Sequence, residues 1–295
     1  MSKLYLKGCG TALVTPFKSG AVDYDSYRSC VERQVEAGVD FLVPLATTGE
    51  TPTLSVEEKL RLLDITRSCA AGLPLLVGCG TNSLQGTLDN MRLLGPHGAD
   101  AYLVVVPYYN KPTQEGQYRY FKAVSEAADK PVVIYNVPGR TGANMTAETA
   151  IRLAEDCPNI IGTKEASGNY SQVSEIIRRA PEGFSVLSGD DDMTLAFMAT
   201  GGQGVVSVAS NVAPREVKAL TDAMLQGDLL KARALHHRLS PLFKNCFLES
   251  NPIPVKAAMA RLGLMSGEVR PPLSDATQMT KEIMSLTLDE LWKSQ

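Results

Sequence analysis

The sequence has few cysteines, no long apolar run and no basic tract, and each absence excludes a class of protein. Six cysteines in 295 residues, with no C-x-x-C pair, are too few for a disulfide scaffold and favour a reduced, cytoplasmic protein. No stretch approaches the roughly 18 consecutive apolar residues of a membrane span. The mixed apolar and polar residues before Pro16 are not typical of a secretory signal. With a formal charge of −3 we expect no nucleic-acid and no membrane partner.

Eight short runs rich in Val, Leu and Ile recur along the chain, each followed by a stretch with helical spacing. They show little in/out alternation, as expected for strands buried on both faces of a parallel sheet. The runs are Thr11–Thr15, Phe41–Ala46, Leu75–Cys79, Ala101–Val106, Val132–Asn136, Ile160–Lys164, Ser185–Ser188 and Gly204–Val208. This pattern predicts an α/β fold, a (β/α)8 (TIM) barrel. A doubly wound sheet is the alternative, but the chain lacks a dinucleotide-binding glycine fingerprint.

Local signals also predict where helices begin and where the barrel ends. Asp23 is placed to cap one helix, and Ser55 with Glu58 has the spacing of a capping box. From about Pro214 onward helices follow one another without strands: Arg215–Leu225, Leu229–Phe247, Ile253–Leu264 and Asp275–Trp292. We therefore expect a barrel over residues 1–226 and a C-terminal helical extension over residues 227–295.

Lys164 ends the sixth predicted strand. In a (β/α)8 barrel the active site forms at the carboxyl ends of the strands. A lysine in that packed interior loses hydration, which lowers its pKa and favours the neutral amine. A neutral amine attacks carbonyl groups and forms a Schiff base. The alternative is an ion pair with Glu165 or a neighbouring carboxylate, and position alone leaves both interpretations open.

Tyr135 ends the fifth predicted strand, one strand away from Lys164. Its phenol could carry protons to and from a carbinolamine if it were linked to other hydroxyl groups. Tyr109 and Thr47 are the available hydroxyls. The alternative is an aromatic side chain at the barrel rim that binds water.

Two further elements are suited to carboxylates. Thr47 and Thr48 precede Gly49 in a turn that offers hydroxyl and main-chain N–H groups to a small carboxylate. Arg140, between Gly139 and Thr141, is a planar double donor for a second one. Ordinary turn chemistry and a solvated surface charge are the respective alternatives.

Other conspicuous residues do not form a metal site. The run Asp190-Asp191-Asp192 has no further ligands to complete a cation site, and we interpret it as capping of the next helix. His97, His236 and His237 lack metal-ligand spacing. We therefore expect no metal and no cofactor, which disfavours metal-dependent aldol chemistry.

The candidate residues lie in motifs by which the chain resembles the dihydrodipicolinate synthase family. That family belongs to the pyruvate-dependent class I aldolase superfamily of N-acetylneuraminate lyase. The motifs follow the family order: T-T-G-E at Thr47–Glu50, P-Y-Y-N-K-P at Pro107–Pro112, Y-N-V-P-G-R-T-G at Tyr135–Gly142, G-T-K-E-A at Gly162–Ala166, S-G-D-D at Ser188–Asp191 and N-P-I-P-V-K at Asn251–Lys256. Any one motif is weak, whereas the set is very specific. Ala46 departs from the glycine that usually precedes the two threonines.

The resemblance implies a lyase that condenses pyruvate with L-aspartate-4-semialdehyde in the diaminopimelate route to L-lysine. It implies these roles: Lys164 forms the imine, Thr47 and Thr48 hold the pyruvate carboxylate, Tyr135, Thr47 and Tyr109 relay protons, Arg140 binds the semialdehyde carboxylate, and the main chain near Gly189 and Val206 lines the pocket. It further implies a homo-oligomer, a dimer of dimers, in which Tyr109 reaches into the neighbouring subunit.

The sequence leaves two alternative functions open, and it also predicts one regulatory property. The chain could be another Schiff-base pyruvate aldolase, such as an N-acetylneuraminate lyase or a 2-keto-3-deoxy-sugar-acid aldolase, or a non-catalytic barrel that binds small acids. Lysine-inhibited members of the family carry histidines and an acidic residue where this chain has Val56, Lys59 and Gly86. A cationic Lys59 would oppose a bound lysine ammonium, so we expect weak or absent feedback inhibition.

Overall fold

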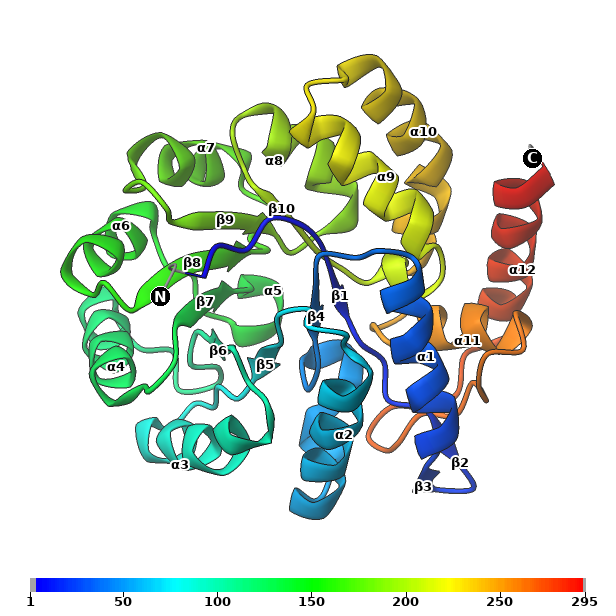
Figure 1. Ribbon diagram of the computed structural model, residues 1–295, viewed down its shortest axis with the longest axis horizontal. Helices are drawn as coiled ribbons and strands as arrows, with labels where there is room; N and C mark the ends of the chain where they lie inside the picture. The colour runs from blue at the N-terminus through cyan, green and yellow to red at the C-terminus, as the bar shows by residue number, and fades with distance from the viewer. Residues whose placement is uncertain (1–3, 294–295) are drawn as a thin grey trace.

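The computed structural model describes residues 4–293 and contains a barrel of eight parallel strands (Figure 1). The strands are β1 (Gly8–Ala12), β4 (Phe41–Val43), β5 (Leu76–Gly78), β6 (Ala101–Val105), β7 (Val132–Asn136), β8 (Ile160–Glu165), β9 (Ser185–Ser188) and β10 (Gly204–Ser207). They pair in the order β4-β1-β10-β9-β8-β7-β6-β5. A parallel bridge between Leu42 and Leu75 joins β4 to β5 and closes the ring. The (β/α)8 prediction is therefore confirmed.

The first strand begins earlier than the sequence predicted. Gly8 and Gly10 belong to β1 and pair with β10, whereas the predicted run Thr11–Thr15 extends beyond the strand. A Cβ atom at Gly8 would lie 2.1 Å from Asp40 Oδ2, and one at Gly10 would lie 2.0 Å from the Phe41 ring. Glycine is required here by close packing, and because glycine is a weak strand former the pattern concealed the strand.

Helices surround the barrel and connect its strands. They are α1 (Tyr24–Glu36), α2 (Val56–Cys69), α3 (Leu84–Leu94), α4 (Gln114–Ala127), the short α5 (Pro138–Thr141), α6 (Ala147–Asp156), α7 (Tyr170–Arg179), α8 (Thr194–Ala199) and α9 (Pro214–Leu225). The predicted caps are confirmed: Asp23 accepts a hydrogen bond from Ser26 N, and Ser55 forms a capping box with Glu58. A two-stranded hairpin, β2 (Phe17–Lys18) with β3 (Ala21–Val22), precedes α1.

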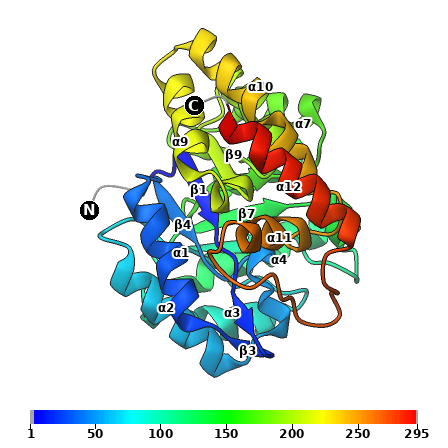
Figure 2. The ribbon, with the colours of Figure 1, turned by 90° about the vertical axis from the view of Figure 1, so that its right-hand side faces the viewer.

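Three helices follow α9 and lie on one side of the barrel (Figures 1 and 2). They are α10 (Leu229–Asn245), α11 (Ile253–Arg261) and α12 (Gln278–Lys293), and we call them the C-terminal helices. Helix α10 packs against α9 and α12, and α12 packs against α11. No helix within residues 4–293 is both long enough and apolar enough to cross a bilayer.

The apolar core has two parts, as the barrel architecture requires. One cluster lies between the strands and the helices, and a second fills the barrel interior. Val133, Ile161, Leu187 and Val206 belong to the interior cluster, together with the ring of Tyr135. The interior is thus packed with side chains below the carboxyl ends of the strands, where a site has to form.

Candidate active site

Lys164 lies inside the barrel near the carboxyl end of β8, and only 4% of it is exposed. Its strand partners are Tyr135 on β7 and Leu187 on β9, both buried. The lysine ion pairs of the described residues involve Lys218 and Lys256, not Lys164. The buried amine is therefore without a carboxylate partner, in the setting that Schiff-base chemistry requires.

Tyr135 contacts Lys164 directly. The Lys164 Nζ atom lies 4.0 Å from the centroid of the Tyr135 ring. The tyrosine is buried in the interior cluster at the carboxyl end of β7. The structure thus brings together the amine and the phenol that the sequence placed on neighbouring strands.

Glu165, the residue next to Lys164, points away from the barrel interior. Its Oε1 atom accepts hydrogen bonds from Asn136 Nδ2 at 2.9 Å and from Ser167 N at 3.1 Å. Burial raises the pKa of Glu165 to about 7, although these hydrogen bonds oppose the rise. The ion pair between Lys164 and Glu165 that the sequence left open does not form.

Gly189 lies against the lysine side chain. A Cβ atom at this position would approach Lys164 Cε to 3.1 Å and Ala166 Cβ to 2.6 Å. Its main-chain N donates a hydrogen bond to Glu165 O at 2.8 Å, which fixes the backbone beside β8. Val206 on β10 is fully buried in the interior cluster that also holds Tyr135. Gly189 thus lies beside Lys164, and Val206 lies in the same interior cluster as Tyr135.

The turn that carries the two threonines follows β4. Residues Thr47–Gly49 form a 3₁₀ turn, in which Thr48 is buried and Thr47 is half-buried. Asn251 Nδ2 donates a hydrogen bond to Thr48 Oγ1 at 3.0 Å. Since Asn251 itself is buried and lies 203 residues away, the turn is held by the C-terminal part of the chain.

Arg140 and Tyr109 both lie at the surface of the single chain. Arg140, in α5, donates a hydrogen bond from an Nη atom to Asn251 O at 3.4 Å, so Asn251 links it to Thr48. Tyr109 is 88% exposed, and its main-chain N donates to Thr141 O. Within one chain the exposed Tyr109 ring is therefore not part of the buried site around Lys164 and Tyr135.

The interpretation of the aspartate run as a helix cap is wrong. Asp190 stands at the N-cap position of the 3₁₀ turn Asp191–Met193, but its side chain makes no capping hydrogen bond. Asp191 instead accepts hydrogen bonds from Val208 N and Ala209 N, both at 2.9 Å. Burial raises the pKa of Asp190 to about 6, and the positive charge of Lys164 opposes that rise. Asp190 is thus an acidic group at the site that local sequence reasoning missed, although it stands in the S-G-D-D motif. Among residues 4–293 no three His, Cys, Asp or Glu side chains are grouped to hold a metal ion.

Comparisons with known proteins find relatives along nearly the whole chain. The model of the dihydrodipicolinate synthetase family matches residues 5–291. A 4-hydroxy-tetrahydrodipicolinate synthase of Phocaeicola vulgatus is 46% identical, with 99% of each chain covered.

Solved structures show the same likeness. A crystal structure of dihydrodipicolinate synthase from Thermotoga maritima has a TM-score of 0.96 at 44% identity, and covers 98% of this chain and 99% of that one. The enzyme of Acinetobacter baumannii, solved in complex with pyruvate, has a TM-score of 0.94 at 37% identity, and covers 97% of this chain and 98% of that one. The chain therefore belongs to the dihydrodipicolinate synthetase family.

Proposed function

We propose that this chain is a lyase that condenses pyruvate with L-aspartate-4-semialdehyde, as a 4-hydroxy-tetrahydrodipicolinate synthase does in the diaminopimelate route to L-lysine. The observation that carries the proposal is the buried amine of Lys164, 4.0 Å from the Tyr135 ring and without a carboxylate partner in residues 4–293. The proposal gains support from the A. baumannii relative, which was solved with pyruvate.

In the first half-reaction Lys164 captures pyruvate. The neutral amine attacks the keto carbon and forms a carbinolamine, which loses water to give an imine. Tyr135 supplies and removes the protons of this step, since its ring contacts the lysine. Thr47 and Thr48, with the main-chain N–H groups of their turn, bind the pyruvate carboxylate.

In the second half-reaction the imine loses a proton from the methyl carbon and becomes an enamine. That carbon attacks the aldehyde of the semialdehyde and forms the new carbon–carbon bond. Arg140, exposed at the mouth of the site, binds the semialdehyde carboxylate. The amino group of the semialdehyde then displaces Lys164 from the imine carbon, which closes the ring and frees the enzyme.

The proton relay requires a second copy of the chain. Tyr109 is 88% exposed and has a left-handed backbone, with φ of 71°. Strained backbone conformations cluster at functional sites, and the exposed ring is accessible to a second copy. Tyr109 of the partner subunit thus completes the relay with Thr47 and Tyr135, in a dimer of dimers. We place the enzyme in the cytoplasm, where its six thiols stay reduced.

Covalent trapping and a coupled assay test this function together. With pyruvate and borohydride the wild type is expected to gain a stable adduct on the peptide that contains Lys164. Lys164→Ala is expected to lose the adduct and to lower kcat by about 10³-fold or more, because the nucleophile is gone. Lys231→Ala, which removes an exposed lysine from α10, serves as the matched control.

Different outcomes distinguish the alternative functions. Cleavage of sugar acids in place of semialdehyde condensation would assign the chain to another aldolase of the superfamily. A wild type that binds pyruvate but leaves Lys164 unmodified would favour a binding protein and overturn the proposal.

A further inference from the structure

A fully buried ion pair joins the C-terminal helices to the turn that carries the threonines. Lys256, in α11, is 0% exposed, and its Nζ atom lies 2.6 Å from Oε1 of Glu50, which is 2% exposed on its side chain. The same Nζ donates a hydrogen bond to Thr15 O at 2.9 Å and lies 4.3 Å from the centroid of the Phe17 ring. The ammonium is thus enclosed by groups that favour its charge, although burial lowers the pKa of Lys256.

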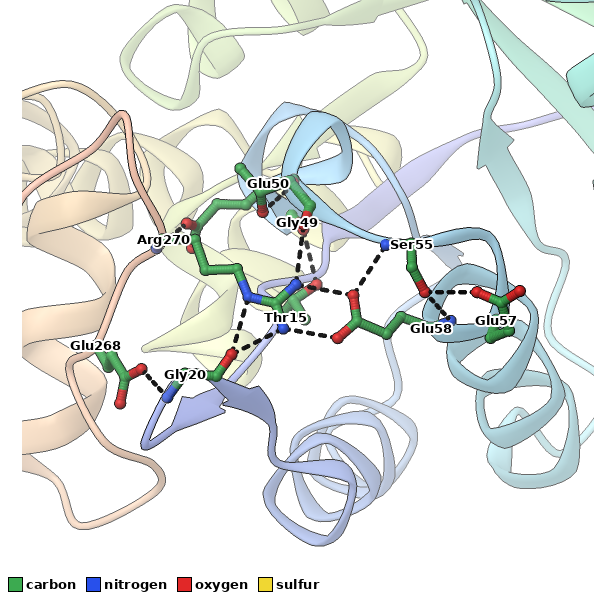
Figure 3. Close-up of polar contacts among 10 residues, drawn as sticks. Thr15, Gly20, Gly49, Glu50, Ser55, Glu57, Glu58, Glu268 and Arg270 are labelled. Carbon is green, nitrogen blue, oxygen red and sulfur yellow. Dashed lines mark hydrogen bonds and ion pairs between the residues drawn. The ribbon is translucent and has the colours of Figure 1, made fainter.

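The second oxygen of Glu50 binds another part of the C-terminal region. Its Oε2 atom accepts a hydrogen bond from Arg270 N at 2.9 Å, and Arg270 lies in the segment between α11 and α12 (Figure 3). The Arg270 guanidinium in turn binds both carboxylate oxygens of Glu58 in α2, at 2.6 and 2.8 Å. One buried carboxylate therefore ties two separate C-terminal segments to the loop after β4.

Glu50 stands at the end of the turn itself. It has a left-handed backbone, with φ of 52°, and its N donates a hydrogen bond to Thr47 O at 3.0 Å. Thr15 Oγ1 donates to Gly49 O at 2.8 Å, beside the main-chain oxygen that Lys256 binds (Figure 3). The residue that bears the buried carboxylate is thus hydrogen-bonded through its main chain to the first of the two threonines.

Stability alone does not account for such a pair. The cost of removing two charges from water offsets most of their attraction. A protein with apolar residues of similar size in place of the pair is commonly as stable. A carboxylate offers what an apolar side chain lacks, namely two directed acceptors that bind two partners at fixed positions.

We propose that Glu50 and Lys256 are positioning residues, through which α11 and the segment before α12 hold Thr47 and Thr48 where they bind the pyruvate carboxylate. Neither side chain touches the substrate. This inference rests on the proposed function, because it concerns the same carboxylate site.

Neutral variants separate positioning from stability. Lys256→Met removes the cation and leaves the Glu50 carboxylate unpaired. The double variant Glu50→Gln/Lys256→Met removes both charges, so that no unpaired charge stays buried. We expect the double variant to keep its Tm within a few degrees of the wild type. Its kcat/KM for pyruvate is expected to fall tenfold or more, whereas kcat/KM for the semialdehyde changes less than threefold, because the lost interaction orients the first substrate.

A control uses a partly exposed ion pair elsewhere in the barrel. Lys218, in α9, pairs with Asp222 and with Asp40, the residue that precedes β4, and so lies at the opposite end of the barrel. Lys218→Met is expected to lower Tm without changing either kcat/KM. Equal losses of both specificity constants in the double variant, or wild-type values in a folded double variant, would show that the pair does not position the turn.

A measurement on the wild type keeps the inference testable if the variants do not fold. Added pyruvate is expected to slow amide hydrogen exchange both in residues 47–50 and in residues 251–256. If pyruvate slowed amide exchange in residues 47–50 alone, the turn and residues 251–256 would not be coupled, and the inference would be overturned. A wild type that forms no borohydride adduct with pyruvate would instead refute the proposed function itself.

Discussion

Two adjacent residues of β8 have opposite surroundings, and this contrast defines the site. Successive side chains of a strand point to opposite faces. Lys164 accordingly faces the barrel interior and Tyr135, whereas Glu165 faces Asn136 and, on α7, Gln172. The same rule, applied to the sequence, would have argued against a pair between the two neighbours. This alternation keeps the Lys164 amine apart from Glu165 and places the buried Glu165 carboxyl group on the opposite face of the strand.

That buried acid predicts a pH dependence of stability. The pKa of Glu165 rises from 4.5 in the unfolded chain to about 7 in the folded one, so the folded state binds more protons in between. The stability that the protonated Glu165 carboxyl group gives the folded state is therefore lost as the pH rises from 4.5 to about 7. We expect Glu165→Gln to gain about 2 kcal/mol of unfolding free energy relative to wild type between pH 5 and pH 8.

Urea unfolding of both proteins at several pH values measures this difference. Because all other titrating groups are shared, the difference between the two curves reports Glu165 alone. A constant difference across the window would show that the carboxyl group titrates normally.

At the scale of elements, the sequence predicts what is local and misses what is distant. Apolar runs and caps located the strands and helices, because both signals lie within a few residues of the element they specify. The hydrogen bond from Asn251 to Thr48 spans 203 residues, and no local pattern reports it. The cap interpretation of Asp191 failed for the same reason, since its partners Val208 and Ala209 lie on the next strand's loop.

The first turns of α2 and α3 predict the response to L-lysine. Val56 is exposed at the start of α2, Lys59 is half-buried one turn further on, and Gly86 lies in the first turn of α3. A cation at this place opposes the ammonium groups of lysine. We therefore expect no inhibition of the condensation at micromolar L-lysine.

A coupled assay with increasing L-lysine measures this response. Lys59→Ala should bind lysine more tightly than the wild type, because the repelling charge is gone. Strong inhibition of the wild type at micromolar lysine would contradict the prediction.

At the scale of the whole molecule, Tyr109 differs from the buried residues of the proposed site. Lys164, Tyr135 and Thr48 lie on the carboxyl ends of its strands or the turns after them, whereas Tyr109 is exposed to solvent. The motif around Tyr109 identified the residue, but the described residues of one chain leave its ring largely exposed. In the proposed dimer the contact is isologous, so that each chain gives Tyr109 to the other.

Mixing two impaired variants tests this arrangement. Tyr109→Phe lacks the relay hydroxyl and Lys164→Ala lacks the nucleophile, so each homodimer should have little activity. A mixed dimer has one site with both Lys164 and Tyr109 intact. With random pairing about half of the dimers are mixed, so about a quarter of all sites should regain wild-type activity. If Tyr109 acted within its own chain, every mixed dimer would keep two defective sites, and unfolding and refolding the variants together would restore nothing.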